Sequence, residues 1–156
     1  FINQINQNKD ITITSSDMTR FMMSLENAVD LVLYAFENGK NGDIFVQKSP
    51  ASTIGMLAEA LIDMSGKKEL KVKNIGIRHG EKMHETLLSR EERLISDETH
   101  KFFRIPADNR DLNYNKYFSV GMNKKVSHDE YNSLNSGRLS EKELTNLLKK
   151  IGYIGK

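Results

Sequence analysis

Strands alternate with helices through the middle of this chain, and that alternation constrains the fold more than any other feature. A helix predicted over 24–37 precedes an apolar strand over 43–46, and a helix capped by Ser52 or Thr53 precedes a strand that begins at Val72. Such units are typical of an α/β domain. The strand over 43–46 is of the buried, parallel-sheet type, which needs strands on both sides. The chain does not supply them, so we expect the rest of the sheet to precede Phe1.

The two ends of the sequence are predicted to be helical. Residues 1–7 resemble the end of a helix whose start is missing, because an apolar and polar pattern begins at Phe1 without an initiator Met. Ser140 and Glu143 form a capping box for a final helix. Residues 107–128 are expected to be irregular, and their aromatic side chains favour packing against another surface of this domain or of another subunit.

Composition excludes several classes of protein. The 156 residues are 38% hydrophobic and 28% charged, which favours a soluble globular domain. A net charge of +2 does not indicate nucleic acid or an anionic membrane as a partner. The absence of cysteine removes disulfides, thiol catalysis and Cys-ligated metals, and no apolar run is long enough for a membrane span.

The stretch Val72–Leu88 indicates an anion site. It begins as a strand, breaks at Gly80 and is predicted to continue as a short helix with Met83, Leu87 and Leu88 close to one face. A glycine lets the backbone approach a ligand closely, a helix start offers free N–H groups, and Arg78 can bind an oxyanion with two parallel hydrogen bonds. The pattern predicts a diphosphate contact at Arg78.

Plainer interpretations remain open for several of these residues. Arg20 either is solvated or salt-bridged, or is a second anion contact that its apolar neighbours partly bury. Arg78 and Glu81 could simply pair on a helix surface. His79 and His84 are five residues apart and form no His-Glu-x-x-His motif, so we expect no metal site.

Three separated blocks carry a resemblance to a known family. They read MTRFMMSLENAVDLVLYAFENGKNGDIFVQKSPASTI, GIRHGEKMHETLLS and FRIPADNRDLNYNKYF. In this order they resemble the bacterial capsule and O-antigen branch of the extended short-chain dehydrogenase/reductases. That branch contains UDP-N-acetylglucosamine 4,6-dehydratases, some of them 5-inverting, and relatives described as UDP-glucose 4-epimerases.

The resemblance implies that this chain is the C-terminal, substrate-binding half of such an enzyme. The family's first half carries a Rossmann fold with a Gly-rich NAD(P) loop and a catalytic Tyr-x-x-x-Lys pair, and the sequence contains neither motif. Catalytic and cofactor-binding residues are therefore expected to lie outside the chain. The implied organisation is substrate-domain entry (1–23), a helix and strand that return to the Rossmann domain (24–47), the substrate-binding domain (48–106) and a C-terminal extension (107–156).

The resemblance also assigns site residues. Carried over, Arg20 and Arg78 hold the diphosphate of the sugar nucleotide, and Glu81 accepts hydrogen bonds from the uridine ribose hydroxyls. His79 stands where the family often has Pro, which changes the stiffness of the loop but leaves Arg78, Gly80 and Glu81 in place. Two arginines suit a diphosphate because each supplies charge-assisted hydrogen bonds of about 1.5–3 kcal/mol.

The expected function is UDP-sugar binding for a 4,6-dehydratase or 4-epimerase in capsular or O-antigen polysaccharide biosynthesis. The full-length enzyme would use NAD(P), act in the cytoplasm and form a homo-oligomer without nucleic-acid or membrane partners, and this half alone would be inactive. The alternative is a stand-alone interaction or regulatory module that is derived from the same fold and works by contact.

Overall fold

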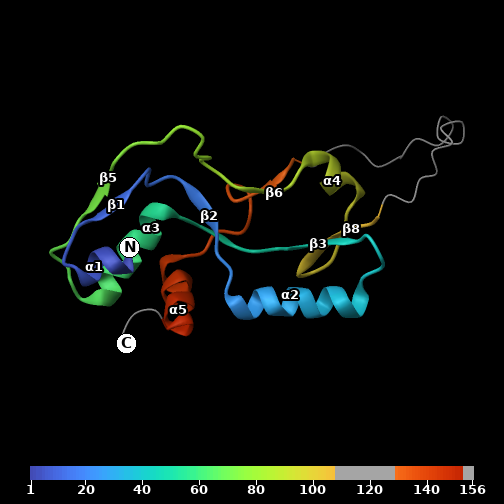
Figure 1. The fold of residues 1–156 in the computed structure, drawn as a ribbon, viewed down its shortest axis with the longest axis horizontal. Coiled ribbons are helices and arrows are strands. Elements are labelled where there is room, and N and C mark those ends of the chain that lie inside the picture. The colour runs from blue at the N-terminus through green and yellow to red at the C-terminus, as the bar shows by residue number, and fades with distance from the viewer. Residues whose placement is uncertain (108–128, 153–156) are drawn as a thin grey trace, which may run out of the picture. The chain divides into compact units, whose positions relative to one another are not determined.

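The structure is a computed structural model that describes residues 1–107 and 129–152 (Figure 1). The chain forms two compact units, which are described separately below. Unit 1 consists of Phe1–Leu25, Ser49–Glu85 and Asn132–Lys156, and unit 2 consists of Glu26–Lys48 and Thr86–Tyr131. Residues 108–128 of the predicted irregular stretch lie outside the described residues.

The hydrophobic core of unit 1 lies between two helices and a pair of parallel strands. Helices α1 (Ile2–Asn6) and α3 (Ile54–Ser65) pack near β1 (Ile11–Ile13), which pairs in parallel with β5 (Val72–Asn74) (Figure 1). The core side chains are aliphatic: Ile5, Ile11, Ile13, Ala58, Leu61, Ile62 and Leu70. Helix α1 confirms that the start of the chain is helical, as the pattern of residues 1–7 predicts.

An ion pair fastens the edge of this β1–β5 sheet. Lys73 Nζ lies 2.7 Å from Asp10 Oδ2, and the backbone N–H of Lys71 donates to Asp10 Oδ1 at 3.0 Å. The Lys73 side chain and this backbone donor both favour the charged carboxylate, so they lower the pKa of Asp10. The pair connects the residue before β1 to β5.

The helix caps of unit 1 agree with the sequence. Thr53 is the N-cap of α3 and accepts a hydrogen bond from Met56 N, and Gly66 ends the helix in the left-handed conformation. In α5 (Glu141–Ile151), Ser140 and Glu143 form the predicted capping box. Their mutual hydrogen bonds lower the pKa of Glu143.

Two further strands of unit 1 position the candidate site. Strand β2 (Thr19–Phe21) pairs antiparallel with β4 (Ala51–Thr53), with Arg20 opposite Ser52. The backbone of residues 137–139 runs beside β4, because Ala51 N donates to Gly137 O and Leu139 N donates to Ala51 O. The C-terminal segment is therefore attached to the same small sheet as Arg20.

The described residues of unit 2 form an antiparallel sheet and two helices. Strand β3 (Ile44–Gln47) pairs with β8 (Phe102–Ile105), which pairs in turn with β7 (Asp97–Glu98). The remaining elements are α2 (Leu25–Asn38), β6 (Thr86–Leu88), α4 (Arg90–Ile95) and β9 (Tyr131–Asn132), and β6 pairs with β9.

A buried carboxylate joins the first strand of this sheet to its neighbour. Asp43 Oδ2 accepts hydrogen bonds from Arg104 Nε at 2.7 Å and from Lys40 N at 2.8 Å, and its side chain is 3% exposed. The Arg104 guanidinium, followed by the Lys40 backbone donor, lowers the pKa of Asp43.

The prediction of a parallel-type strand over 43–46 was wrong within the described residues. The strand is present as β3, but its partner there is the antiparallel β8, and Ile44 is exposed. A continuous apolar run reports burial of both faces, and it carries no information about the direction of the neighbouring strand. The α/β alternation itself is confirmed.

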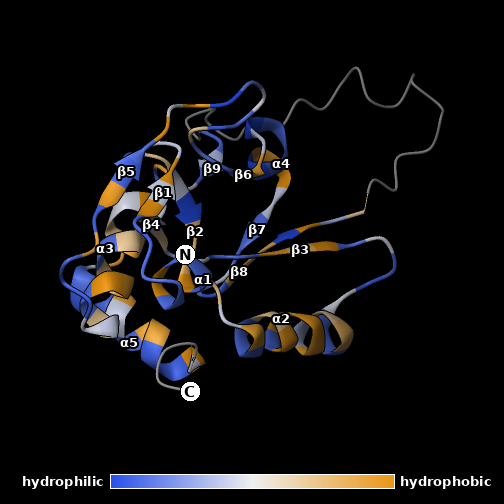
Figure 2. Cartoon of the chain, turned by 60° about the vertical axis from the view of Figure 1, so that its left-hand side comes forward, coloured by the Kyte–Doolittle hydropathy of each residue, from blue (hydrophilic) through white to orange (hydrophobic). Residues whose placement is uncertain are grey.

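Helix α2 shows an apolar surface with little cover. None of its residues is buried, and Leu25 and Phe36 are 82% and 83% exposed. Figure 2 shows hydrophobic residues recurring along α2. The exposed apolar side chains are Leu25, Val29, Val32, Leu33 and Phe36. Throughout the described ranges, no helix combines the length and the hydrophobicity that crossing a bilayer requires.

Candidate functional site

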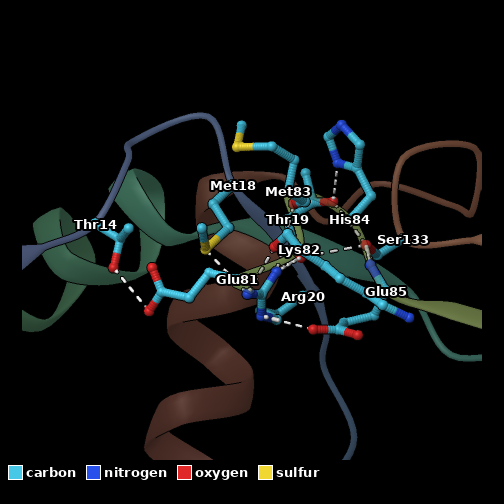
Figure 3. A network of polar contacts seen from close by, with 10 residues as sticks. All are labelled: Thr14, Met18, Thr19, Arg20, Glu81, Lys82, Met83, His84, Glu85 and Ser133. Carbon is cyan, nitrogen blue, oxygen red and sulfur yellow. Dashed lines mark hydrogen bonds and ion pairs between the residues drawn. The ribbon is translucent and has the colours of Figure 1, made fainter. Parts of the chain in front are cut away.

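Strand β2 contacts the stretch Val72–Leu88, which the sequence indicates as an anion site, and this contact defines the candidate site (Figure 3). The backbone N–H of Thr19 donates to Met83 O at 2.9 Å. Since β4 occupies the other side of β2, the segment Lys82–Glu85 lies along the free edge of that strand. All residues of the site described here belong to unit 1.

The Arg20 guanidinium is held by the chain itself. Its Nη1 donates to Thr19 O at 2.7 Å and to Met83 O at 3.4 Å, and its Nη2 donates to Lys82 O at 3.0 Å. Nη2 also lies 3.0 Å from the sulfur of Met18. Arg20 Nε lies 3.5 Å from Glu85 Oε1, with the side chains 28% and 42% exposed. The salt-bridged interpretation of Arg20 therefore fits this geometry, and its diphosphate contact stays a prediction.

Arg78 and Glu81 form a compact turn. Glu81 Oε2 accepts from Arg78 N at 3.1 Å, and Glu81 N donates to Arg78 O at 3.2 Å. Gly80 lies within the turn at φ +85°, a conformation that favours glycine. Thr14 Oγ1 donates to the other carboxylate oxygen of Glu81 at 3.4 Å. The carboxylate is thus oriented by groups from two parts of unit 1.

The Arg78 guanidinium has a different environment from that of Arg20. Arg78 is exposed, and no hydrogen bond or ion pair joins its side chain to another residue in the part of the chain that the structure describes. Its five N–H donors remain free for a ligand. The Glu81 carboxylate uses two of its roughly four acceptor positions for Arg78 N and Thr14 Oγ1, so it can also accept from ligand hydroxyl groups.

The short helix predicted after Gly80 is absent. Residues 81–85 form an irregular segment that leads into β6. Their backbone groups bond to distant residues, with Met83 O accepting from Thr19 N and Glu85 O accepting from Ser133 N, so they do not form helical i to i−4 hydrogen bonds. The helix N-terminus that was expected to assist anion binding is therefore not part of the site.

A polar cluster of Thr19, His84 and Ser133 was not found from the sequence. Thr19 Oγ1 lies 2.8 Å from His84 Nδ1 and 2.7 Å from Ser133 Oγ. Thr19 and Ser133 are 1% and 0% exposed. Nothing in the local pattern could reveal the pairing, because the two residues are 114 positions apart and Ser133 lies in a polar stretch that is typical of a turn.

The histidines do not gather around a cation. Across residues 1–107 and 129–152, no group of three or more His, Cys, Asp or Glu side chains has the arrangement of a metal site. His79 is exposed in the Arg78–Glu81 turn, and the Nδ1 atom of His84 contacts Thr19.

Unit 1 also has a hollow of about 340 Å³ whose character does not suit a phosphate. Its lining includes four carboxylates, from Asp17, Glu59, Asp63 and Glu141. Like charges would repel an anionic ligand there. The exposed guanidinium of Arg78 is the better candidate for anion binding.

Both parts of the chain match families of known proteins. Residues 1–107 match the family described as "Polysaccharide biosynthesis protein", and residues 108–155 match "Polysaccharide biosynthesis protein C-terminal". UDP-glucose 4-epimerase of Rickettsia felis is 54% identical over 99% of this chain and 45% of its own length. The protein of the same name from Rickettsia prowazekii is 53% identical over 100% of this chain and 46% of its own length.

A solved structure supports the same placement. The X-ray structure of Pen from Bacillus thuringiensis has a TM-score of 0.80 and 31% sequence identity to this chain, and the match covers 99% of this chain and 45% of Pen. The chain thus spans a little under half the length of the relatives it matches. It belongs to the polysaccharide biosynthesis protein family, and it corresponds to the C-terminal part of an extended short-chain dehydrogenase/reductase.

Proposed function

We propose that this chain forms the UDP-sugar-binding part of a nucleotide-sugar 4-epimerase or 4,6-dehydratase that serves bacterial polysaccharide biosynthesis. The observation that supports the proposal most strongly is its 54% identity, along 99% of the chain, to a protein named UDP-glucose 4-epimerase. That name favours the epimerase over the dehydratase. The contribution of this chain is to bind and orient the sugar nucleotide.

In this proposal the Arg78–Glu81 turn contacts the nucleotide. The free guanidinium of Arg78 binds the diphosphate, for which a planar, always-charged fork is well suited. Glu81, oriented by the Arg78 backbone and by Thr14, accepts from the ribose hydroxyls. Arg20 contributes a second diphosphate contact only where a phosphate oxygen replaces one of its present acceptors.

The residues of this chain do not fit NAD(P). The sequence has no Gly-x-Gly-x-x-Gly turn and no Tyr-x-x-x-Lys pair. We therefore assign the cofactor and the hydride chemistry to the remainder of the full-length protein.

The same remainder accounts for the exposed face of α2. An apolar stripe that includes Leu25, Val32 and Phe36 is costly to leave in water. We assign its cover to the part of the full-length protein that lies outside this sequence. The stripe counts against the stand-alone module, which would function with this surface uncovered.

The test is calorimetric titration of the full-length protein with UDP. Replacement Arg78→Ala should weaken UDP binding by about 2–3 kcal/mol, or roughly 30- to 150-fold, because it removes a charge-assisted diphosphate contact. Lys68→Ala is the matched control, since it removes one exposed positive charge of unit 1 outside the candidate site. Equal affinities of Arg78→Ala and Lys68→Ala for UDP would disprove the assignment of Arg78.

A further inference from the structure

We propose that Ser133, from the C-terminal segment, is a positioning residue that fixes the segment Lys82–Glu85 and, through it, the Arg78–Glu81 turn. The inference rests on the proposed function for the identity of the ligand. It assigns a role to a residue of the C-terminal region, which spans residues 108–155.

Ser133 makes a reciprocal contact with Glu85. The Ser133 N–H donates to Glu85 O at 2.8 Å, and the Glu85 N–H donates to Ser133 Oγ at 2.9 Å. The backbone of Glu85 is thereby held through both of its polar groups. A buried side chain that satisfies a backbone N–H is difficult to replace, because its loss leaves that donor without a partner.

The same hydroxyl also reaches β2. Ser133 Oγ donates to Thr19 O at 3.2 Å and lies 2.7 Å from Thr19 Oγ1 (Figure 3). Ser133 thus joins the strand that carries Arg20 to the segment whose carbonyls Arg20 binds. Its complete burial means that water does not compete for these bonds.

One arrangement of protons satisfies the whole polar cluster. Each hydroxyl has one proton, so a Ser133 hydroxyl that donates to Thr19 O must accept from the Thr19 hydroxyl. Thr19 Oγ1 must then accept from His84, which places a proton on Nδ1 of the imidazole. All contacts of the cluster are satisfied together in this arrangement, and a buried polar network that is fully satisfied holds its residues in one conformation.

The turn that contains Ser133 is held by its own hydrogen bonds, independently of the polar cluster. Asn132 Oδ1 accepts from Leu134 N at 2.9 Å and from Asn135 N at 3.0 Å, and Ser136 N donates to Asn132 O. After the turn, Gly137 is bonded to β4. Because the chain after Ser133 is anchored to β4 and the turn itself is held by Asn132, the Ser133 hydroxyl can restrain Glu85 rather than follow it.

The test combines Ser133→Ala with Arg78→Ala in the full-length protein, using UDP as the probe. If Ser133 acts through the turn, Ser133→Ala weakens UDP binding about tenfold when Arg78 is present and less than twofold in the Arg78→Ala background. The matched control is Ser136→Ala, whose buried hydroxyl has no partner within the described residues, and it should bind UDP as the wild type does. Equal factors in both backgrounds would overturn the inference.

Amide hydrogen exchange supplies a reading that does not depend on UDP. In the unliganded protein, Ser133→Ala should speed exchange across residues 78–85 and leave α3 unchanged, whereas general destabilisation would speed both. Unchanged exchange in 78–85 would overturn the inference even if the wild type binds UDP. Failure of the wild type to bind UDP would overturn the proposed function instead, and the exchange data would still decide whether Ser133 holds the segment.

A second variant covers the case in which Ser133→Ala does not fold. Thr19→Val removes one hydroxyl of the cluster at nearly constant volume and leaves the reciprocal contact between Ser133 and Glu85 intact. It should weaken UDP binding by about threefold, a smaller effect than that of Ser133→Ala. Wild-type affinity and exchange in Thr19→Val would overturn the part of the inference in which the hydroxyl contact between Thr19 and Ser133 helps to hold the segment.

Discussion

Replacement of Arg20 by alanine should destabilise unit 1, and the structure gives the size of the effect. Two guanidinium contacts are short hydrogen bonds to carbonyls, 2.7 Å to Thr19 O and 3.0 Å to Lys82 O. At about 1–1.5 kcal/mol each they account for about 2–3 kcal/mol of unfolding free energy. The 3.4 Å contact with Met83 O and the half-exposed pair with Glu85 add only a few tenths.

The assay is urea unfolding of the 156-residue chain at pH 7, with midpoint and slope compared between variants. Arg20→Lys should recover less than half of the loss, because one ammonium group cannot span carbonyls that a planar fork reaches together. Glu85→Gln, which removes the ion pair and keeps the backbone contacts, should cost less than about 0.5 kcal/mol.

The result that would refute this reasoning is equally definite. If Arg20→Ala changes the unfolding free energy by less than about 0.5 kcal/mol, the guanidinium does not tie β2 to the Lys82–Glu85 segment. A strong loss of UDP affinity in such a stable variant would then assign Arg20 to direct diphosphate binding, as the family resemblance implies.

Three further predictions concern other parts of the molecule. Asp43→Asn should lower the stability at pH 7 and make it depend less on pH. Because folding lowers the pKa of Asp43, this carboxylate stabilises the fold above its pKa in the unfolded chain, near 4, and the stabilisation is lost on further acidification. Urea midpoints measured between pH 2 and 7 would show the difference. Leu144→Ala, at a fully buried position of α5, should cost about 2–5 kcal/mol in chemical denaturation, and a cost below 1 kcal/mol would contradict this packing. Phe36→Asp should reduce the binding of a hydrophobic dye to the isolated chain without lowering its stability, and unchanged fluorescence would show that α2 is not the exposed surface.

The helix ends of unit 1 could be predicted from the sequence, because the hydrogen bonds that cap them join residues close together in the chain. The Thr53 cap, the box of Ser140 with Glu143, and the glycine that ends α3 each involve residues a few positions apart. These contacts are read directly from spacing, and the corresponding helices are present as predicted. The Arg78–Glu81 turn is also held by hydrogen bonds between residues three apart, although the pattern predicted only a break at Gly80 followed by a short helix.

Distant partners decided the features that were missed. The Met83–Leu88 stretch has apolar spacing that is compatible with a short helix, yet Thr19 and Ser133 take its backbone groups into non-local hydrogen bonds. Likewise, an apolar run does not reveal that β3 will meet an antiparallel partner in β8. Tertiary contacts override weak local preference, and a single sequence does not report which contacts these will be.

Unit 1 is assembled from three separate segments of the chain, and this affects how it forms during synthesis. Ser133 lies 48 residues after Glu85, the residue whose backbone it holds. At about 5–20 residues per second, a ribosome takes roughly 2–10 s to cover that distance. During this interval the nascent chain carries a complete Arg78–Glu81 turn that lacks its last restraint. A protease or chaperone could therefore bind this segment while the chain is still on the ribosome. A nonsense mutation just before Ser133 would leave the turn permanently without this restraint.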